Sequence, residues 1–553
     1  MPEEISQPKR PKGAAVQLDE LFAPWNRTDA PGLVVAVAKG GSVLYRRGFG
    51  MASLESPVAN TTRTRMRIGS TSKHFTALLA LLLADEGKLD LDVPIRTYIP
   101  ELTGPGGDPS IRLLLQHRGG SRCYLDLQFL CHGMTPPPVG TGLRTQVRQK
   151  TRNFAPGEAM IYNNGGYHLT SIAIERIDGT PFEAQLKQRL FDPLGMYDTA
   201  SIRSDYVITP GGATLHVSSP DGGWRRGLFP TEEIRGEGAI VSTVDDILCW
   251  MAHLRSREKF GSPSVWAALT ELPIYPGGAT GKYALGLMID TYRGVRTVRH
   301  AGGVIGGSSE MLTVPEHALD VVILVNGAPG ADPMKLAEQV VDILLAPQLK
   351  DAAPNLQVQE YAPWLGDWWS AETGMVYSLV DDAGALKLSM CNLPTSMSRP
   401  LSLDHLQDGR IVVPSVSVSD VALAFDRAHT EELCITFGGR TAAYEKLSRE
   451  SADTASFAAA AVGRYYSADA DCTAVIAQDG ERLVIGLSDA HGGVAVNLQC
   501  LGESVAVTAP QTSSVPHWSA LSFAKRNGIM TGFRMNSMRT RNLEFERRAT
   551  HEP

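Results

Sequence analysis

Arg67-Ile68-Gly69-Ser70-Thr71-Ser72-Lys73-His74-Phe75 directly precedes a long apolar run that ends at Ala84. Small polar residues before an apolar run predict a turn that leads into a helix. Ser70 and Lys73 are three residues apart, so a helix places them on one face, where the amine can help to take the hydroxyl proton. The free N–H groups and the dipole at a helix start favour such a nucleophile. Ser-x-x-Lys alone is a weak signal, because an N-capping serine beside a solvated lysine gives the same pattern.

Length and composition predict a globular protein of two or three domains, since the chain has 553 residues, 43% of them hydrophobic and 20% charged. The net charge of −7 argues against binding to nucleic acid or to an anionic membrane. No run reaches the ~18 apolar residues that span a bilayer, and the N-terminus has no apolar export segment. Seven scattered cysteines without Cys-x-x-Cys spacing argue against a disulfide framework or a zinc site. We expect a cytoplasmic protein that needs no cofactor, with a loose N-terminus at residues 1–15.

A second informative stretch, residues 154–167, reads Phe-Ala-Pro-Gly-Glu-Ala-Met-Ile-Tyr-Asn-Asn-Gly-Gly-Tyr. Its Pro-Gly pair predicts a turn, and a helix is expected at residues 168–177. Tyr162, on a tight loop before that helix, can act as a general base if its pKa is depressed beside a lysine. Asn164 supplies an amide that can orient the lysine or hold a substrate carbonyl. A turn with a packed tyrosine is the alternative interpretation.

A third stretch, residues 297–303, reads Thr-Val-Arg-His-Ala-Gly-Gly and lies among segments whose alternation predicts one antiparallel sheet. We expect Gly302 and Gly303 at a strand start, where they would let a substrate backbone approach closely. The N–H groups of Gly303 and Ser70 could then form an oxyanion hole. Taken alone, His300 before two glycines would more often be structural.

The three patterns occur in the order Ser-x-x-Lys, Tyr-x-Asn and His-x-Gly, and they are accompanied by Gly87–Leu91, Leu194–Met196 and Gly238–Asp246. In these motifs, over residues 30–345, the chain resembles the class C-type branch of the serine β-lactamase-like, penicillin-recognising superfamily. The resemblance implies a catalytic domain at residues 16–345 of the α/β type, in which an antiparallel sheet with helices lies beside a helical subdomain.

The resemblance also implies a role for each motif residue. Ser70 would be the acylated nucleophile, Lys73 and Tyr162 would share the proton transfers, and Asn164 would orient. His300 fills the third motif, where many relatives have Lys-Thr-Gly. A histidine is mostly neutral at pH 7 and holds an anion less well than a lysine. We therefore expect a substrate with no carboxylate at that end: an amide, an ester, or a peptide cleaved at its N-terminal residue.

Beyond residue 345 the chain changes character, and two similar blocks begin at residues 365 and 462 with Leu-Gly-Asp-Trp-Trp-Ser-Ala and Val-Gly-Arg-Tyr-Tyr-Ser-Ala. Short alternating segments with glycine turns predict two antiparallel β-barrels, at residues 355–447 and 457–549. This layout resembles that of the D-aminopeptidases, which carry a catalytic domain followed by two eight-stranded barrels. The resemblance implies release of D-residues, mainly D-alanine, from the N-termini of peptides, amides and esters, and a homodimer.

In those enzymes an acidic residue in a loop of the last barrel helps to define the pocket for the substrate amine. The corresponding segment here, residues 505–518, contains no carboxylate. Glu237 is the nearest acidic candidate in the catalytic domain, although a surface glutamate is the more common interpretation of such a residue.

We therefore expect a metal-free serine hydrolase, acylated at Ser70, that acts on a small peptide, amide or ester and releases an N-terminal D-amino acid. An esterase or amidase of the same fold without a D-amine requirement is the first alternative. A catalytically silent binding protein on the same fold is the alternative from another class.

Overall fold

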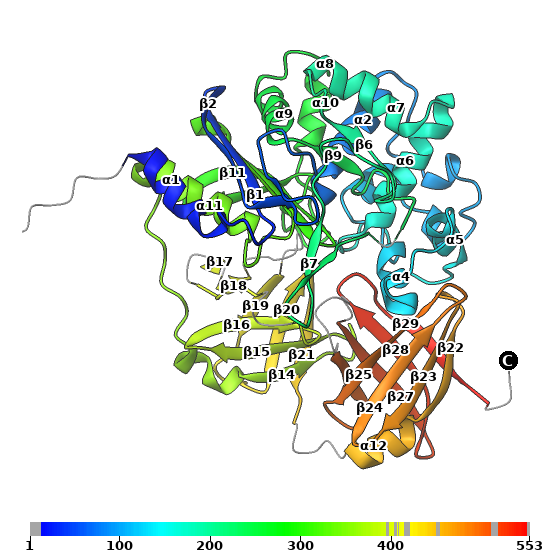
Figure 1. Cartoon of the computed structure of the whole chain (residues 1–553). Coiled ribbons are helices and arrows are strands. Elements are labelled where there is room, and N and C mark those ends of the chain that lie inside the picture. Colours follow the sequence, from blue (N-terminus) through cyan, green and yellow to red (C-terminus); the bar gives the residue numbers. More distant parts are fainter. Residues whose placement is uncertain are drawn as a thin grey trace, which may run out of the picture.

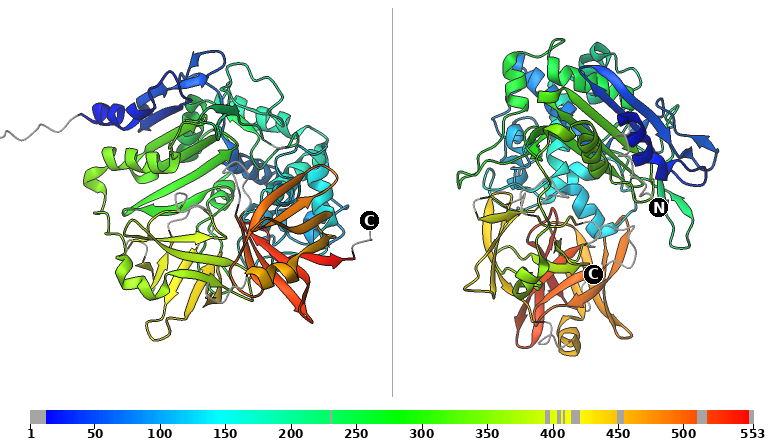
Figure 2. Two further views of the ribbon diagram at one scale, coloured as in Figure 1. Left: turned by 60° about the horizontal axis from the view of Figure 1, so that its bottom comes forward. Right: turned by 90° about the vertical axis from the view of Figure 1, so that its left-hand side faces the viewer.

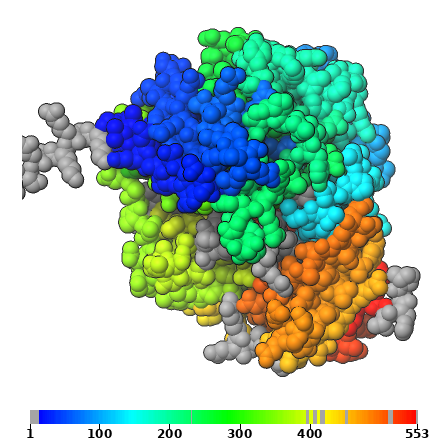
Figure 3. Space-filling model, viewed as in Figure 1, coloured from blue at the N-terminus to red at the C-terminus, as the bar shows by residue number. Residues whose placement is uncertain are grey.

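The computed structural model describes residues 13–229, 231–393, 398–402, 406–407, 409–413, 421–448, 454–509 and 518–549. Three parts follow one another along the chain and pack into one mass (Figures 1 and 3). The N-terminal part, coloured blue to green, lies above two β-rich parts that lie side by side (Figures 1 and 2). Within the described ranges, every helix is too short or too polar to span a bilayer.

A six-stranded antiparallel sheet forms the centre of the N-terminal part, in the order β10-β11-β12-β13-β1-β2. The strands are β1 (Leu33–Lys39), β2 (Ser42–Phe49), β10 (Met288–Tyr292), β11 (Val295–Val304), β12 (Gly307–Val314) and β13 (Leu319–Val325). Alternate side chains of a strand face opposite ways. Val35 and Val37 accordingly pack against α1 (Ala14–Phe22) and α11 (Pro333–Leu344), while Val34 and Ala36 face the helical region.

The helical region is built around α2, which is apolar on all sides and therefore almost wholly buried. Its helices are α2 (Lys73–Asp85), α3 (Ile111–Leu115), α4 (Tyr124–His132), α5 (Thr141–Arg148), α6 (Asn164–Asp178), α7 (Phe182–Leu186), α8 (Asp192–Leu194), α9 (Val244–Ser256) and α10 (Pro263–Leu269). Short ladders join β3 (Met51–Ser53) to β4 (Val58–Ala59), β5 (Met66–Arg67) and β6 (Ala200–Ser201) to β9 (Ile240–Ser242), and β7 (His216–Ser218) to β8 (Trp224–Arg226).

The two β-rich parts each contain eight strands. The middle part has the order β16-β15-β14-β21-β20-β19-β18-β17, and the last part is a closed barrel preceded by α12 (Thr454–Ala461). The middle strands are β14 (Gly366–Trp369), β15 (Val376–Asp382), β16 (Ala385–Met390), β17 (Leu406–Gln407), β18 (Arg410–Val412), β19 (Val421–Phe425), β20 (Glu432–Phe437) and β21 (Arg440–Lys446). The barrel strands are β22 (Gly463–Ser467), β23 (Cys472–Asp479), β24 (Arg482–Ser488), β25 (Gly493–Cys500), β26 (Val505–Ala509), β27 (Ser519–Arg526), β28 (Ile529–Ser537) and β29 (Leu543–Arg548).

The predicted fold class is confirmed, with one difference in the middle part. There the expected barrel is a curled, open sheet, because no pairing between described residues joins β16 to β17. The edge of β16 instead contacts the segment that follows it, where Lys387 is bridged to Pro400 and the Leu401 N–H donates to the Leu386 oxygen at 2.9 Å.

One local prediction was confirmed with an earlier start, and another was wrong. The helix expected at residues 168–177 begins at Asn164, because the Asn163 side chain caps it by accepting a hydrogen bond from the Gly165 N–H at 2.7 Å. Gly302 and Gly303 lie at the end of β11 rather than at its start, because that strand already begins at Val295 and runs through the third motif.

Candidate active site

Ser70 lies in a single 3-10 turn, Gly69–Ser72, that joins β5 to α2. Gly69 has a φ of +51°, and a Cβ atom there would lie 2.9 Å from the backbone nitrogen of Gly303. Only glycine therefore lets this turn lie against the end of β11. The serine side of the turn remains partly exposed, so a substrate can reach the hydroxyl. The predicted turn into a helix is confirmed.

Lys73, the first residue of α2, is completely buried beside that hydroxyl. Its Nζ lies 3.0 Å from Ser70 Oγ, 2.9 Å from Asn164 Oδ1 and 2.6 Å from the backbone oxygen of Glu237. Burial lowers the pKa of Lys73 well below its usual value; the charge of Glu237 raises it and that of Arg539 lowers it further. Asn164 thus orients the lysine, which was one of the two functions expected of its amide.

The three partners of Lys73 suit a neutral amine. An uncharged amine has two N–H donors and one lone pair, and here it meets two carbonyl-type oxygens and one hydroxyl. The two oxygens take the N–H groups, which leaves the lone pair for the proton of Ser70. This arrangement can activate the serine as a nucleophile.

Tyr162 lies beside the same hydroxyl, and two basic side chains lie close to its ring. Lys73 Nζ is 4.8 Å from the ring centroid, and the guanidinium carbon of Arg539 is 4.9 Å from it. Burial raises the pKa of Tyr162, although the charge of Arg539 and the nearby Ser70 hydroxyl partly lower it. The condition that we set for a general base, a depressed pKa, is not met, because burial dominates. A protonated phenol is suited to giving its proton to a leaving group.

His300 has both ring nitrogens engaged inside the protein. Nδ1 lies 2.6 Å from the Ala301 oxygen and so carries the proton, while Nε2 accepts from the Tyr283 hydroxyl at 3.0 Å. Burial, and then the charge of Lys73, lowers the pKa of His300 to about 3. The expected neutral imidazole is therefore confirmed. Because both ring nitrogens are already hydrogen-bonded within the protein, the ring does not offer a hydrogen bond to a substrate.

The two glycines of the third motif differ in what they approach. A Cβ atom on Gly302 would lie 1.8 Å from the Ile68 oxygen. This glycine therefore lets β11 pack against the backbone just before Ser70, and it does not provide space for a substrate backbone. A Cβ atom on Gly303 would meet nothing within 4 Å. Gly303 therefore borders open space beside the serine turn, as an oxyanion-hole residue must.

Glu237 is buried, so the surface interpretation of this residue was wrong. Its carboxylate accepts hydrogen bonds from the Tyr124 hydroxyl at 2.5 Å and from the Arg235 N–H at 3.2 Å, and it lies 3.1 Å from His168 Nδ1. Burial raises the pKa of Glu237, but His168 and the bond from Tyr124 outweigh it and leave the pKa lowered. The carboxylate is thus held within the protein, while the backbone oxygen of the same residue holds Lys73.

Arg539 is a residue of the site that was missed in the sequence. It lies between β28 and β29 of the C-terminal barrel, and the loop that carries it is fixed to the catalytic part. Asn153 donates to the Arg539 oxygen at 3.0 Å and accepts from the Arg541 N–H at 2.7 Å. Asp126, on α4, accepts from the hydroxyls of Ser537 and Thr540. No local pattern marks Arg539, because only tertiary packing brings it to Tyr162.

The barrel segment that was expected to reach the site, residues 505–518, lies only partly within the described residues. Val505–Ala509 forms β26, and residues 510–517 lie outside the described residues.

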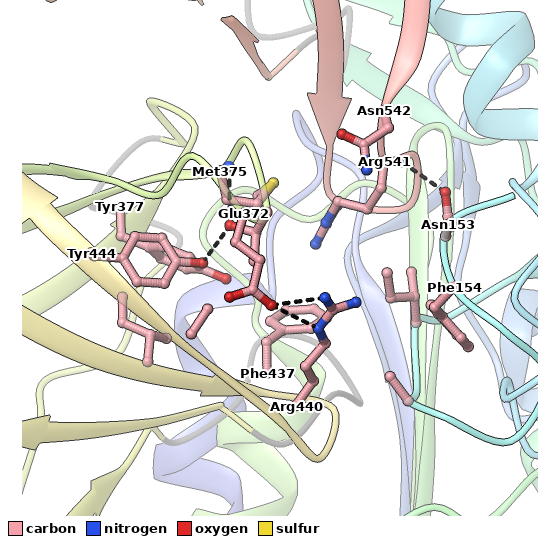
Figure 4. Close-up of a pocket in the computed structure, with 15 residues that line it drawn as sticks. Asn153, Phe154, Glu372, Met375, Tyr377, Phe437, Arg440, Tyr444, Arg541 and Asn542 are labelled. Atoms are coloured by element: carbon pink, nitrogen blue, oxygen red, sulfur yellow. Dashed lines mark hydrogen bonds and ion pairs between the residues drawn. The ribbon is translucent and has the colours of Figure 1, made fainter.

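A pocket lies where the three parts meet, next to the loop that carries Arg539 (Figure 4). Arg440 forms an ion pair with Glu372 at 2.7 Å on one side, and Arg541 and Asn542 lie on the other. The catalytic part contributes Asn153, Phe154, Ala159 and Ile161. None of the catalytic candidates lines the pocket. Its lining residues Ala159 and Ile161 place it beside the segment that carries Tyr162.

Comparisons with known proteins identify relatives of this chain. A D-aminopeptidase of Brucella anthropi is 31% identical over 361 residues, which are 64% of this chain and 66% of that protein, just under two thirds of its length. A D-aminopeptidase of Brucella canis is 28% identical over 362 residues, with the same coverage.

Two solved structures share the fold. The octameric penicillin-binding protein homologue from Pyrococcus abyssi has a TM-score of 0.54 at 23% identity, covering 78% of this chain and 99% of that one. The D-amino acid amidase from Ochrobactrum anthropi SV3, complexed with D-phenylalanine, has a TM-score of 0.51 at 23% identity, covering 61% and 98%. The Beta-lactamase family matches residues 18–345, more than half of the sequence. The chain therefore belongs to the Beta-lactamase family.

Proposed function

We propose that this protein is a serine hydrolase that releases N-terminal D-amino acids from small peptides, amides or esters through an acyl-enzyme on Ser70. The observation that carries the proposal is the 3.0 Å contact between the Ser70 hydroxyl and a buried Lys73 amine of lowered pKa. The preference for a D-residue with a free amine is supported by the similarity to D-aminopeptidases.

The proposed reaction has two halves. Ser70 Oγ attacks the acyl carbon while its proton passes to Lys73 Nζ, and the N–H groups of Ser70 and Gly303 hold the oxyanion. The bond to the leaving group then breaks as Tyr162 donates its proton, and Lys73 returns a proton to the phenol. In the second half a water molecule attacks the ester, which frees the D-amino acid and restores the Ser70 hydroxyl.

An esterase or amidase without a D-amine requirement is the second candidate, and one observation favours it. A bound ammonium group calls for a carboxylate or other acceptor nearby. The carboxylate of Glu237 is held by Tyr124, Arg235 and His168, so it is not free to take that part. A catalytically silent binding protein is the third candidate, and a burst of leaving group would eliminate it.

Hydrolysis of D-alanine, L-alanine and N-acetyl-D-alanine p-nitroanilides by the wild type and by Ser70→Ala tests the proposal. We expect cleavage of the free D-amine alone and no turnover by Ser70→Ala. Equal rates on the L-alanine or acetylated substrate would replace the aminopeptidase with the second candidate. A mass increase on the wild-type protein that Ser70→Ala lacks would mark the acyl-enzyme.

We also propose a cytoplasmic location and a homodimer. All seven cysteines are unpaired, which suits a reducing compartment. The dimer rests on the resemblance to D-aminopeptidases, and light scattering of the purified protein tests it.

A further inference from the structure

We propose that Arg539 binds the carboxylate of the substrate's leaving group, so that the preferred substrates are D-aminoacyl dipeptides with a free C-terminus. This inference rests on the proposed function and names its substrate class. It makes the C-terminal barrel a part of the substrate site, through a single side chain that lies against Tyr162.

The guanidinium of Arg539 is available for an anion. Arg539 is partly exposed as a residue, and its guanidinium forms no ion pair with any carboxylate among the described residues. The neighbouring arginines are engaged: Arg122 pairs with Asp469 at 2.9 Å, and Arg541 donates to the backbone oxygens of Ser537 and Thr540. A planar guanidinium without a partner can hold a carboxylate through two parallel hydrogen bonds.

The loop that carries this side chain is fixed in position. Asn153 binds the backbone on both sides of residue 540, and Asp126 accepts two hydroxyls from the same turn. Arg122 donates to the backbone oxygens of Arg541 and Asn542 at 2.9 and 2.8 Å. Binding an anion therefore needs little further ordering of the protein, which favours affinity.

The reach from Tyr162 fits a dipeptide. If Tyr162 protonates the leaving nitrogen, the carboxyl carbon of a leaving amino acid is two bonds further on, each about 1.5 Å long. The carboxylate thus lies within a few bond lengths of the phenol, and the Arg539 guanidinium carbon is 4.9 Å from the phenol ring. Each additional residue moves the carboxylate by up to ~3.6 Å, so a longer peptide loses this contact.

The other cationic candidates near the nucleophile cannot replace Arg539. Lys73 Nζ is already surrounded by the Ser70 hydroxyl and two carbonyl-type oxygens. His300 is neutral at pH 7 and has both nitrogens engaged. The earlier expectation of no carboxylate beside His300 is compatible with this assignment, because the carboxylate is placed at the barrel side of the site.

The test compares three substrates that differ only beyond the scissile bond: D-Ala-Gly, D-Ala-glycinamide and D-Ala-Gly-Gly. Release of D-alanine is measured for the wild type, Arg539→Gln and Arg539→Lys. Arg534→Gln is the matched control, because Arg534 lies on β28 of the same barrel, is exposed, and pairs with Glu544 at 3.2 Å. Thermal unfolding of each variant checks that it is folded.

We expect the wild type to prefer D-Ala-Gly over its amide about tenfold or more in kcat/KM, the range of one charge-assisted hydrogen bond. Arg539→Gln should abolish this preference, chiefly through KM for the free acid, and Arg539→Lys should retain part of it. Arg534→Gln should keep the wild-type ratio. A ratio of substrates cancels any general effect of the charge on the rate.

Two outcomes overturn the inference and are distinguishable. If the wild type cleaves D-alanine p-nitroanilide but the acid-to-amide ratio is near one, or if Arg539→Gln leaves a high ratio unchanged, this inference alone is wrong. If the wild type cleaves no D-aminoacyl substrate, the proposed function is wrong and the inference falls with it.

Discussion

Two basic side chains approach the Tyr162 ring from two regions of the molecule, and they differ in burial, in partners and in charge state. Lys73, from the start of α2, is completely buried and has three hydrogen-bonding partners. Arg539, from the loop between β28 and β29, is partly exposed and has no carboxylate partner among the described residues. Their distances from the ring are nearly equal, 4.8 and 4.9 Å.

The difference indicates a division of work between the two regions. Burial favours the neutral form of an amine, and a neutral amine can take a proton. A guanidinium keeps its charge under all ordinary conditions and therefore cannot be a base, but it can select an anion. The catalytic part thus supplies the chemistry, and the barrel supplies a charge that selects the substrate.

The largest effect is expected when the buried amine of Lys73 is replaced by a guanidinium group. Lys73→Arg places a permanently charged group beside Ser70, and this group has no lone pair for the hydroxyl proton. We expect kcat/KM to fall by about 10³-fold, in the range of a lost general base. The measurement is hydrolysis of D-alanine p-nitroanilide at saturating and limiting substrate. Retention of more than a tenth of the wild-type rate would show that Lys73 is not the base.

The next largest effect is expected from replacing the buried carboxylate of Glu237, whose charge acts on Lys73. The negative charge of Glu237 raises the pKa of Lys73, so Glu237→Gln lowers it. Because the neutral amine is the active form, the acidic limb of the pH profile of kcat/KM should move to lower pH. The variant should also lose about 1–3 kcal/mol of stability, since His168 and Tyr124 are placed to hydrogen-bond a charged carboxylate. Denaturant unfolding measures the loss. A limb that moves to higher pH would contradict the assignment of that limb to Lys73.

How much could be read from the sequence depended on the distance over which residues had to be brought together. The pair Ser70 and Lys73 was predictable because one helical turn joins them, and so was Asn164 beside Tyr162. Sequence reasoning also gave the neutral state of His300, since histidine begins near neutrality and burial moves its pKa further in the same direction.

Three features of the site could not be read from the sequence. The direction of the Tyr162 pKa shift could not be predicted, because burial is a property of the assembled fold. Glu237 was placed on the surface, because its partners Tyr124 and His168 lie far from it in sequence. Arg539 comes from another part of the chain, and no motif in its segment pointed to the active site.

Replacing Arg539 should shift the acidic limb of the pH profile in the direction opposite to replacing Glu237. The charge of Arg539 lowers the pKa of Lys73 and that of Tyr162. Arg539→Gln therefore raises the pKa of Lys73, so the acidic limb of the profile should move to higher pH. The shift of the acidic limb should be smaller than for Glu237→Gln, because Glu237 is the stronger of the two influences on Lys73. Arg534→Gln, measured in parallel, should leave the profile in place.

The smallest effect is expected from loosening the barrel loop without removing its charge. Asn153→Ala deletes the hydrogen bonds to the Arg539 oxygen and from the Arg541 N–H. The guanidinium remains, but its position becomes less certain, so the preference for D-Ala-Gly over D-Ala-glycinamide should fall by about threefold, as for a single neutral hydrogen bond. Asn26→Ala, an exposed asparagine near the N-terminus, is the control. An undiminished preference in a folded Asn153→Ala protein would show that the other anchors, Asp126 and Arg122, are enough to hold Arg539 over Tyr162. A loss as large as that of Arg539→Gln would show instead that the charge acts only when its loop is held rigidly against the catalytic part.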